Sequence, residues 1–484
     1  MKNKKSLYSV NPKDRVGVGA RLAYSIGFAG KDGFQTIVNN YLMIFLMMVG
    51  GLNGAFIGTM MLAARIWDAI NDPILGTIAD HTNTRFGRYR PYVLSSIPMA
   101  VIFGFLFFIP NISGGAKMVY ATIFYLLYGM CFTVLEVPYF GLTGAMTNSP
   151  QERATITAWS RIASRIPAFA WPLVLAAFVT RFDGPDMPIG PHGVFYTAIL
   201  VGAVAIVTSL FPFFICKEKA VQIIPKEERQ KGGVFKDFLN VLKGNWALLV
   251  VMIIQLFFTF NTILSDMINT YYLTYSLGSP ALIMGVGVAL VAVGAAIGQA
   301  IYPYIATRVQ SCKTIMLVGV ACYCALLACC YLAGNKSTVT YLIVLIILNM
   351  FSGALQINVI NLCFEVCDKL EYKNGKRSDA TVFAVVSFLM KLAAGLAATI
   401  AGWGLMMVGF EGMGPVMIEV TPEMAHGVAI LRFLLPGVLA GISFVAALFY
   451  PIKKKEIQDI RAELEERHAA AHPEGPEGGM PEAE

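Results

Sequence analysis

The sequence predicts an all-α membrane protein with twelve transmembrane helices in two pseudo-symmetric six-helix bundles. Of its 484 residues, 56% are hydrophobic and 14% are charged, and its mean hydropathy is +0.64, whereas soluble domains carry about 25% charged residues. Twelve apolar stretches are long enough, at about 20 residues, to cross a hydrocarbon core of about 30 Å. A charged segment, residues 217–245, divides these stretches six and six.

The order of the apolar stretches predicts the domain organisation. They lie near residues 22–47, 53–80, 91–110, 116–144, 154–180, 194–216, 246–276, 281–305, 314–334, 339–365, 380–408 and 428–450. We expect an amino-terminal six-helix bundle (1–216), a central cytoplasmic loop (217–245), a carboxy-terminal six-helix bundle (246–450) and a cytoplasmic tail (451–484). The tail begins with the charged sequence KKKEIQDIRAELEERH and ends in Pro, Gly, Glu and Ala, which predicts a short helix followed by disorder.

The positive charges predict the orientation in the membrane. If both termini are cytoplasmic, most of the 37 Lys and Arg residues fall in cytoplasmic segments, and the outer loops keep only Lys117, Arg181 and Lys336. The sequence therefore predicts a multi-pass protein of the plasma (inner) membrane. The net charge of +7 reflects this topology and gives no support to nucleic-acid binding. No apolar signal-peptide region precedes the first stretch.

The sequence favours a transporter and lacks the motifs of several other function classes. Short basic connections follow the second and eighth stretches, GTIADHTNTRFGRYR and the less basic ATRVQSCK, an arrangement typical of transporters with a central site between two repeats. No Walker motif is present, and no nucleophile stands beside a base, so neither ATP-driven transport nor an enzyme is indicated. The nine cysteines lie in apolar stretches without CxxC metal spacing, which predicts packing roles.

The second stretch contains ARIWDAINDPILG, in which two carboxylates stand one helical turn apart. Asp68 and Asp72 are i and i+4, so they share one helix face about 6 Å apart. In a site of low dielectric constant, both stay ionised only if a cation joins them. Pro73 frees a backbone carbonyl and Asn71 adds a polar group, a donor set that suits Na⁺ or Li⁺, while one carboxylate suffices for H⁺. The alternative is a structural ion pair between Arg65 and Asp68.

Other ionisable residues within the stretches are candidates for solute contacts, because charged groups at membrane depth are costly. Asp32, Glu136 and Arg161 can each make two hydrogen bonds to sugar hydroxyls. Arg165 lies one turn beyond Arg161, which would suit an anionic ligand such as a hexuronide. The alternatives are that it pairs with Asp266 or Glu136 as a gate, or that it lies near the outer water interface. Asp266 belongs to a polar stripe with Asn261 and Asn269 that lines either the solute cavity or a plain water path.

The motif ARIWDAINDPILG, followed by NTRFGRYRPY, resembles the signature of the glycoside-pentoside-hexuronide:cation symporters, a family typified by the melibiose permease within the major facilitator superfamily. The resemblance extends to Gly30-Lys31-Asp32, Glu136-Val-Pro138-Tyr, Arg161, EVCDKLEYKNGKR and Lys391. It implies symport of a sugar or glycoside, with uronides among the candidates, by alternating access. It also implies a Na⁺, Li⁺ or H⁺ site at Asp68 and Asp72, with Asn71 and with Thr133 from the fourth stretch, and no other cofactor.

The resemblance also implies a solute pocket and gates. The pocket would be formed by Lys31, Asp32, Glu136, Phe140, Arg161, Ser387 and Lys391. Glu136, Phe140, Phe132 and Val386 depart from the melibiose permease pattern, so the identity of the sugar stays open. The gating residues would be Arg65, Asp80, Arg85, Arg88, Arg90, Glu365, Asp368, Glu371 and Arg377, with solvated surface charge as the alternative. We expect a monomer. Symport of an amphiphile such as a lysolipid, and a non-transporting sensor, are the alternative functions.

Overall fold

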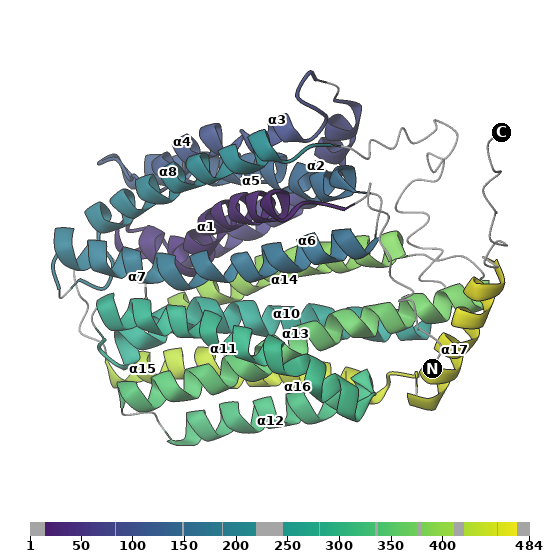
Figure 1. Ribbon diagram of the computed structural model, residues 1–484. Helices are drawn as coiled ribbons and strands as arrows, with labels where there is room; N and C mark the ends of the chain where they lie inside the picture. The colour runs from purple at the N-terminus through teal and green to yellow at the C-terminus, as the bar shows by residue number, and fades with distance from the viewer. Residues whose placement is uncertain are drawn as a thin grey trace.

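The computed structural model describes residues 15–82, 84–147, 150–185, 187–218, 245–279, 281–333, 337–374, 379–410, 421–452 and 454–471, and it is almost entirely helical there (Figure 1). The first half of the molecule contains α1 (Val18–Met48), α2 (Gly54–His81), α3 (Arg90–Val93), α4 (Ser96–Leu106), α5 (Gly114–Met146), α6 (Pro150–Ala163), α7 (Arg165–Phe182) and α8 (Pro191–Ile215). Helices α6 and α7 are separated only by Ser164.

The second half contains helices that repeat this pattern of long, nearly parallel spans. They are α10 (Trp246–Tyr271), the π-helical turn η2 (Tyr272–Ser276), α11 (Ala281–Val309), α12 (Cys312–Ala333), α13 (Thr338–Asn374), α14 (Asp379–Met407), α15 (Pro422–Ala429), the π-helical turn η3 (Ile430–Leu434) and α16 (Leu435–Leu448). The amphipathic helix α17 (Lys454–Ala471) follows at the sequence predicted for a tail helix.

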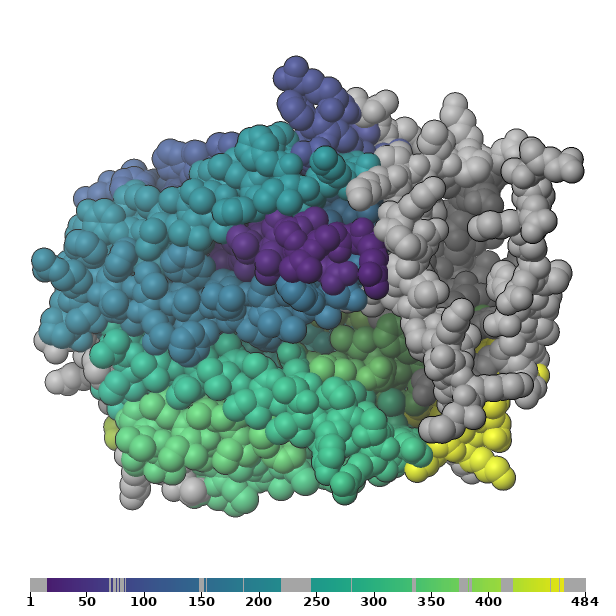
Figure 2. All heavy atoms as spheres, in the orientation of Figure 1, coloured from purple at the N-terminus to yellow at the C-terminus, as the bar shows by residue number. Residues whose placement is uncertain are grey.

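The helices account for the apolar stretches and confirm the predicted fold class. Among the described residues, nine helical spans are long and apolar enough to cross a membrane. The three remaining stretches correspond to α1, α2 and α3–α4; α1 and α2 carry the ionisable residues that the sequence singled out. The arrangement is consistent with twelve spans. The two halves lie one above the other in Figure 2, and the central cavity is found between them.

The halves contact each other most closely at the end of the molecule away from α17. There α2 packs along α14 and α7 packs along α11. A Cβ atom on Gly402 would lie 2.1 Å from the carbonyl oxygen of Gly54, and one on Gly58 would lie 2.6 Å from the carbonyl oxygen of Ala398. Glycine therefore permits a backbone-to-backbone approach that no other residue would allow.

Helix α17 lies at the opposite end, across the ends of several second-half helices (Figure 1). Lys369 of α13 forms an ion pair with Glu456 of α17 at 2.7 Å. The Lys454 ammonium donates to the carbonyl of Val309 at 3.0 Å, while Ile457 is buried. These contacts tie α17 to α11 and α13.

Candidate functional site

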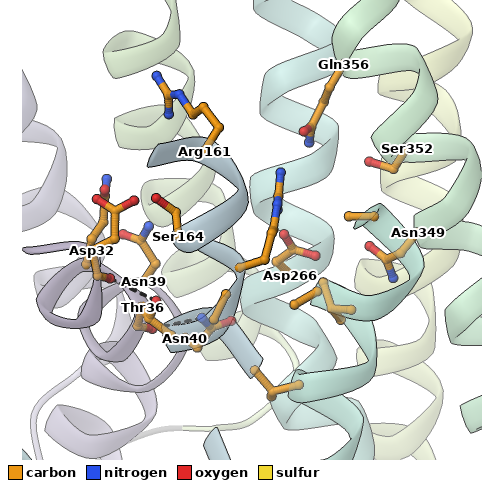
Figure 3. Close-up of a pocket in the computed structure, with 17 residues that line it drawn as sticks. Asp32, Thr36, Asn39, Asn40, Arg161, Ser164, Asp266, Asn349, Ser352 and Gln356 are labelled. Carbon is orange, nitrogen blue, oxygen red and sulfur yellow. Dashed lines mark hydrogen bonds between the residues drawn. The ribbon is translucent and has the colours of Figure 1, made fainter. Parts of the chain in front are cut away.

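A polar cavity of about 290 Å³ lies between the two halves (Figure 3). Its lining comes from α1, α6–α7, α10, α11 and α13, namely Asp32, Gln35, Thr36, Asn39, Asn40, Arg161, Ser164, Arg165, Ala168, Asp266, Val288, Val291, Ala292, Ala295, Asn349, Ser352 and Gln356. The first half supplies most of the charge and amide groups, and α11 supplies an apolar strip. Carboxylates, guanidiniums and amides facing one space are suited to a solute with many hydroxyl groups.

Two guanidiniums enter the cavity from the same side. Arg161, Ser164 and Arg165 are spaced i, i+3 and i+4, which places them on one face where α6 passes into α7. Arg161 lies 5.8 Å from the ring centre of Phe28 and 6.0 Å from that of Phe140. Arg165 donates to the amide oxygen of Gln299 at 2.7 Å. Within the described residues neither guanidinium has a carboxylate oxygen closer than 4.0 Å, so both are available to an acceptor.

Lys31 forms a charge cluster beside the cavity. Its ammonium lies 2.7 Å from Asp32 Oδ1 and 3.0 Å from Glu136 Oε1, and it sits over the rings of Phe28 and Phe132 at 4.6 and 4.8 Å. The side chain of Lys31 is 2% exposed, so it does not face the cavity itself. The Lys31 ammonium bridges Asp32 of α1 and Glu136 of α5. It thereby fixes the position of Asp32, which does line the cavity.

The two aspartates of α2 lie beside α5, apart from the main cavity. Arg65 contacts Asp68 Oδ2 at 3.3 Å. Among the described residues, no hydrogen-bond partner is found for three buried atoms: Asp68 Oδ1, Asp72 Oδ1 and the amide nitrogen of Asn71. Buried carboxylate oxygens without partners are costly. The pair therefore has free acceptor capacity at the position that the sequence indicated for a cation.

Helix α5 approaches this aspartate pair through a glycine. A Cβ atom on Gly129 would lie 2.9 Å from Asp68 Oδ1. Thr133, one turn further along, donates its hydroxyl to the Gly129 carbonyl at 3.2 Å, which leaves its oxygen lone pairs free to accept or to coordinate. Among the described residues, no group of three His, Cys, Asp or Glu side chains is placed to hold a metal ion. A cation here would therefore combine two carboxylates with neutral oxygens.

Lys391 lies at the aspartate pair, although the resemblance implied a place in the solute pocket. Its ammonium forms an ion pair with Asp72 Oδ2. Because Lys391 is on α14 and Asp72 is on α2, this ion pair joins the two halves. An ammonium group thus supplies one positive charge next to the oxygens that a Na⁺ ion would need.

Of the seven residues predicted for the solute pocket, two, Asp32 and Arg161, line the cavity. Glu136 lies outside the lining and pairs with Lys31. Phe140 is 47% exposed and packs edge-on against Phe28, and Ser387 is an exposed residue of α14. The polar cavity is therefore centred further along α1 than the solute pocket that the resemblance implied.

The predicted gating residues of the loop after α2 contact the end of α8 and the residues that follow it. The backbone amides of Arg88, Tyr89 and Arg90 donate to the carboxylate of Glu218 at 2.7 to 2.9 Å. The Arg90 guanidinium donates to the carbonyl of Phe213. Arg85 lies over the ring of its neighbour Phe86. The loop after α2 is thus clamped to the end of α8.

The predicted gate in the second half lies on α13. Glu365 accepts a hydrogen bond from Tyr450 at 3.0 Å, and Asp368 and Glu371 lie on the next turns towards the α17 end, Glu371 being 9% exposed. The side chain of Asp80 and residue Arg377 lie outside the described part of the chain.

Several cavity residues were not predicted, although α1 and α13 carry a signal for them. Gln35, Thr36, Asn39 and Asn40 follow Asp32 at spacings of three and four. Asn349, Ser352 and Gln356 repeat this spacing on α13. Neutral polar residues at helical period inside an apolar stretch mark a face turned away from lipid, a signal that charged residues alone do not carry.

Comparison with known proteins identifies the family. The profile of the MFS/sugar transport protein family matches residues 23–454. The chain belongs to this family. It is 29% identical over 467 residues to the isoprimeverose transporter of Lactiplantibacillus pentosus, covering 95% of this chain and 94% of that protein. It is 25% identical over 452 residues to the glucuronide carrier protein homolog of Escherichia coli K12, covering 92% and 95%.

A solved structure shares the fold of this MFS/sugar transport protein. The nucleoside transporter NupG superposes with a TM-score of 0.60 at 13% identity, covering 89% of this chain and 98% of NupG. These comparisons confirm the resemblance seen in the sequence and the fold class. The protein is a multi-pass membrane transporter and not an enzyme.

Proposed function

We propose that this transporter is a symporter that couples inward movement of a monovalent cation, Na⁺ or H⁺, with Li⁺ as a substitute, to uptake of a sugar or glycoside. The observation that carries the proposal is the pair Asp68 and Asp72, with a buried, unpartnered oxygen on each carboxylate and with Lys391 from the other half already bound to one of them. We further propose that it lies in the plasma (inner) membrane with both termini cytoplasmic, as the positive charges favour.

Charge balance at the aspartates gives a coupling mechanism. Arg65 and Lys391 together offset the two negative charges of Asp68 and Asp72. A cation that binds both carboxylates adds one positive charge, so the Lys391 ammonium is repelled and leaves Asp72. Because Lys391 is on α14, its departure removes a contact between the halves and favours their relative movement. Solute affinity and cation affinity then raise each other by linkage.

The cavity favours a solute that carries an acidic group. Arg161 and Arg165 face it from one wall, and their contacts are with aromatic rings and a neutral amide. Guanidiniums pair with carboxylates in two-point hydrogen bonds, which supports a uronide as the solute. The name of the glucuronide carrier homolog points in the same direction. The polar lining favours such a solute over an amphiphile such as a lysolipid.

Counterflow in proteoliposomes tests this function. Labelled methyl β-D-glucuronide, methyl β-D-glucoside and methyl β-D-xyloside would be compared with and without Na⁺ at two pH values. We expect exchange of at least one sugar, stimulation by Na⁺ or by acid, and loss of gradient-driven accumulation in Asp68→Asn and Asp72→Asn. Asp459→Asn, an exposed aspartate of α17, is the matched control. Undiminished accumulation in both site variants would overturn the coupling mechanism.

A further inference from the structure

A buried guanidinium stands behind the second-half wall of the cavity. Arg432 is 2% exposed. Its Nε donates to the hydroxyl of Tyr341 and its Nη1 to the hydroxyl of Ser265, each at 2.9 Å. Tyr341 in turn donates to the amide oxygen of Asn269 at 2.6 Å. A positive charge placed inside a membrane bundle is costly, so it needs a reason beyond packing.

The hydrogen bonds of Arg432 lead to a residue next to a carboxylate that faces the cavity. Both of its hydrogen-bond acceptors are neutral, and no carboxylate oxygen of the described residues lies within 4.0 Å of it. Asp266 directly follows Ser265, the residue to which Arg432 donates, on α10. Asp266 lines the cavity and points into it in Figure 3. The guanidinium is thus buried in the bundle, whereas the carboxylate beside its hydrogen-bond partner Ser265 faces the cavity.

Asp266 has its acceptor capacity free. It makes no hydrogen bond or ion pair with any residue in the described ranges, and an ionised carboxylate can accept several hydrogen bonds. Thr36 and Asn40, on the opposite wall, direct their side chains to carbonyls of their own helix. Among the second-half residues that line the cavity, Asp266 is the charged acceptor.

The backbone around this pair departs from α-helical geometry in two places. Arg432 lies within the π-helical turn η3, and the π-helical turn η2 begins directly after α10. The two turns meet where Tyr272 packs edge-on against Phe433, with ring centres 5.1 Å apart. Phe433 and Tyr341 also lie against the guanidinium. Because π-helical turns concentrate at functional sites, this geometry is a second sign of a role beyond packing.

We propose that Asp266 binds solute hydroxyl groups and that Arg432 is the positioning residue that, through its hydrogen bond to Ser265, holds this turn of α10 so that the Asp266 carboxylate is directed into the cavity. This inference rests on the proposed sugar transport. It gives the solute an orientation: hydroxyl groups against α10 and the acidic group against Arg161 and Arg165. Helix α10 belongs to the second half, whereas Arg161 and Arg165 belong to the first half. A bound solute therefore contacts both halves, one with each end.

Equilibrium binding of methyl β-D-glucuronide and of its single-deoxy derivatives to the purified full-length protein tests the inference. We expect Asp266→Asn to weaken binding of the parent by about 10- to 100-fold, the effect of losing a charged acceptor. The derivative that lacks the contacted hydroxyl should bind wild type and Asp266→Asn equally. Arg432→Gln should reproduce this selective loss, and Arg432→Lys should recover part of it. The double variant should bind no more weakly than the worse single variant.

Two controls separate positioning from folding. Arg308→Gln removes an exposed arginine of α11 and should leave binding unchanged. Thermal unfolding of each variant reports loss of structure. If Arg432→Gln weakens binding of the parent and of every deoxy derivative alike, Arg432 has only a structural role. If Asp266→Asn binds the parent as wild type does, the inference fails while sugar transport stands. If wild type neither binds nor exchanges any sugar of the panel, the proposed function itself fails.

Discussion

The glycine contacts between α2 and α14 predict that one added methyl group shifts the balance between the two states of the transporter. The carbonyl oxygen of Gly54 is only 2.1 Å from the Cβ position of Gly402, and the carbonyl carbon is at 2.8 Å. Backbone atoms cannot relieve such a contact by changing rotamer, as a side chain can. Gly402→Ala therefore forces the helices apart at the end where the halves now meet.

The magnitude follows from the cost of overpacking. Extra methylene groups in a packed core destabilise by about 1–3 kcal/mol, and this penalty applies only while the halves are closed at this end. The population open at this end should therefore rise by a factor of about 5–150. Gly441→Ala is the matched control, since a Cβ atom there has nothing within 4 Å.

Cysteine accessibility measures the shift. Thr270 is fully buried at this end, and its hydroxyl contacts the carbonyl of Asn40. We expect a Thr270→Cys reporter, labelled by a membrane-impermeant thiol reagent, to react faster in Gly402→Ala by that factor and at the unmodified rate in Gly441→Ala. Cys363, buried in α13, detects general loosening. Equal labelling of Thr270→Cys with and without Gly402→Ala would refute the reasoning.

Three further predictions concern the aspartate pair and the loop after α2. Lys391→Gln removes the ammonium that competes for Asp72, so the apparent affinity for the coupling cation should rise by about tenfold or more, as read from the cation dependence of sugar binding; an unchanged dependence would contradict displacement of Lys391. Gly129→Ala places a methyl group against Asp68 Oδ1 and should weaken cation affinity several-fold, while sugar binding without cation stays as in wild type; Gly144→Ala, with open space around its Cβ position, is its control. Glu218→Gln removes a charged acceptor from three backbone amides at the start of α3 and should lower stability by about 1–3 kcal/mol, measured by thermal unfolding; an unchanged midpoint would show that water replaces the carboxylate.

The sequence alone predicted those features that depend on spacing within a single helix. Asp68 and Asp72 are one turn apart on a single helix, so their spacing predicts that they share a face whatever the rest of the chain does. The fold class likewise follows from the length and number of apolar stretches. Both predictions depend on the geometry of a single helix and not on how the helices pack together.

Contacts between the halves could not be derived in this way. The partner of Lys391 depends on how α14 lies against α2, which is set by the glycine contacts along their length. Arg432 was visible as a charge within a span, but its contact with Ser265 depends on the turn η3, which interrupts the helical period of 3.6 residues on which sequence reasoning relies. The position of the cavity similarly depends on the break at Ser164, which turns Arg161 and Arg165 inward together.

Helix α17 has a practical consequence for observing this transporter at work. Its ion pair with Lys369 and its hydrogen bond to the Val309 carbonyl fasten it to two helices of the second half at once. A fluorophore attached to α17 would therefore report the tilt of a whole bundle and not the bending of a single span. Paired with a second dye on the loop that Glu218 clamps to α8, it would turn each transport cycle into a change of distance between two rigid bodies.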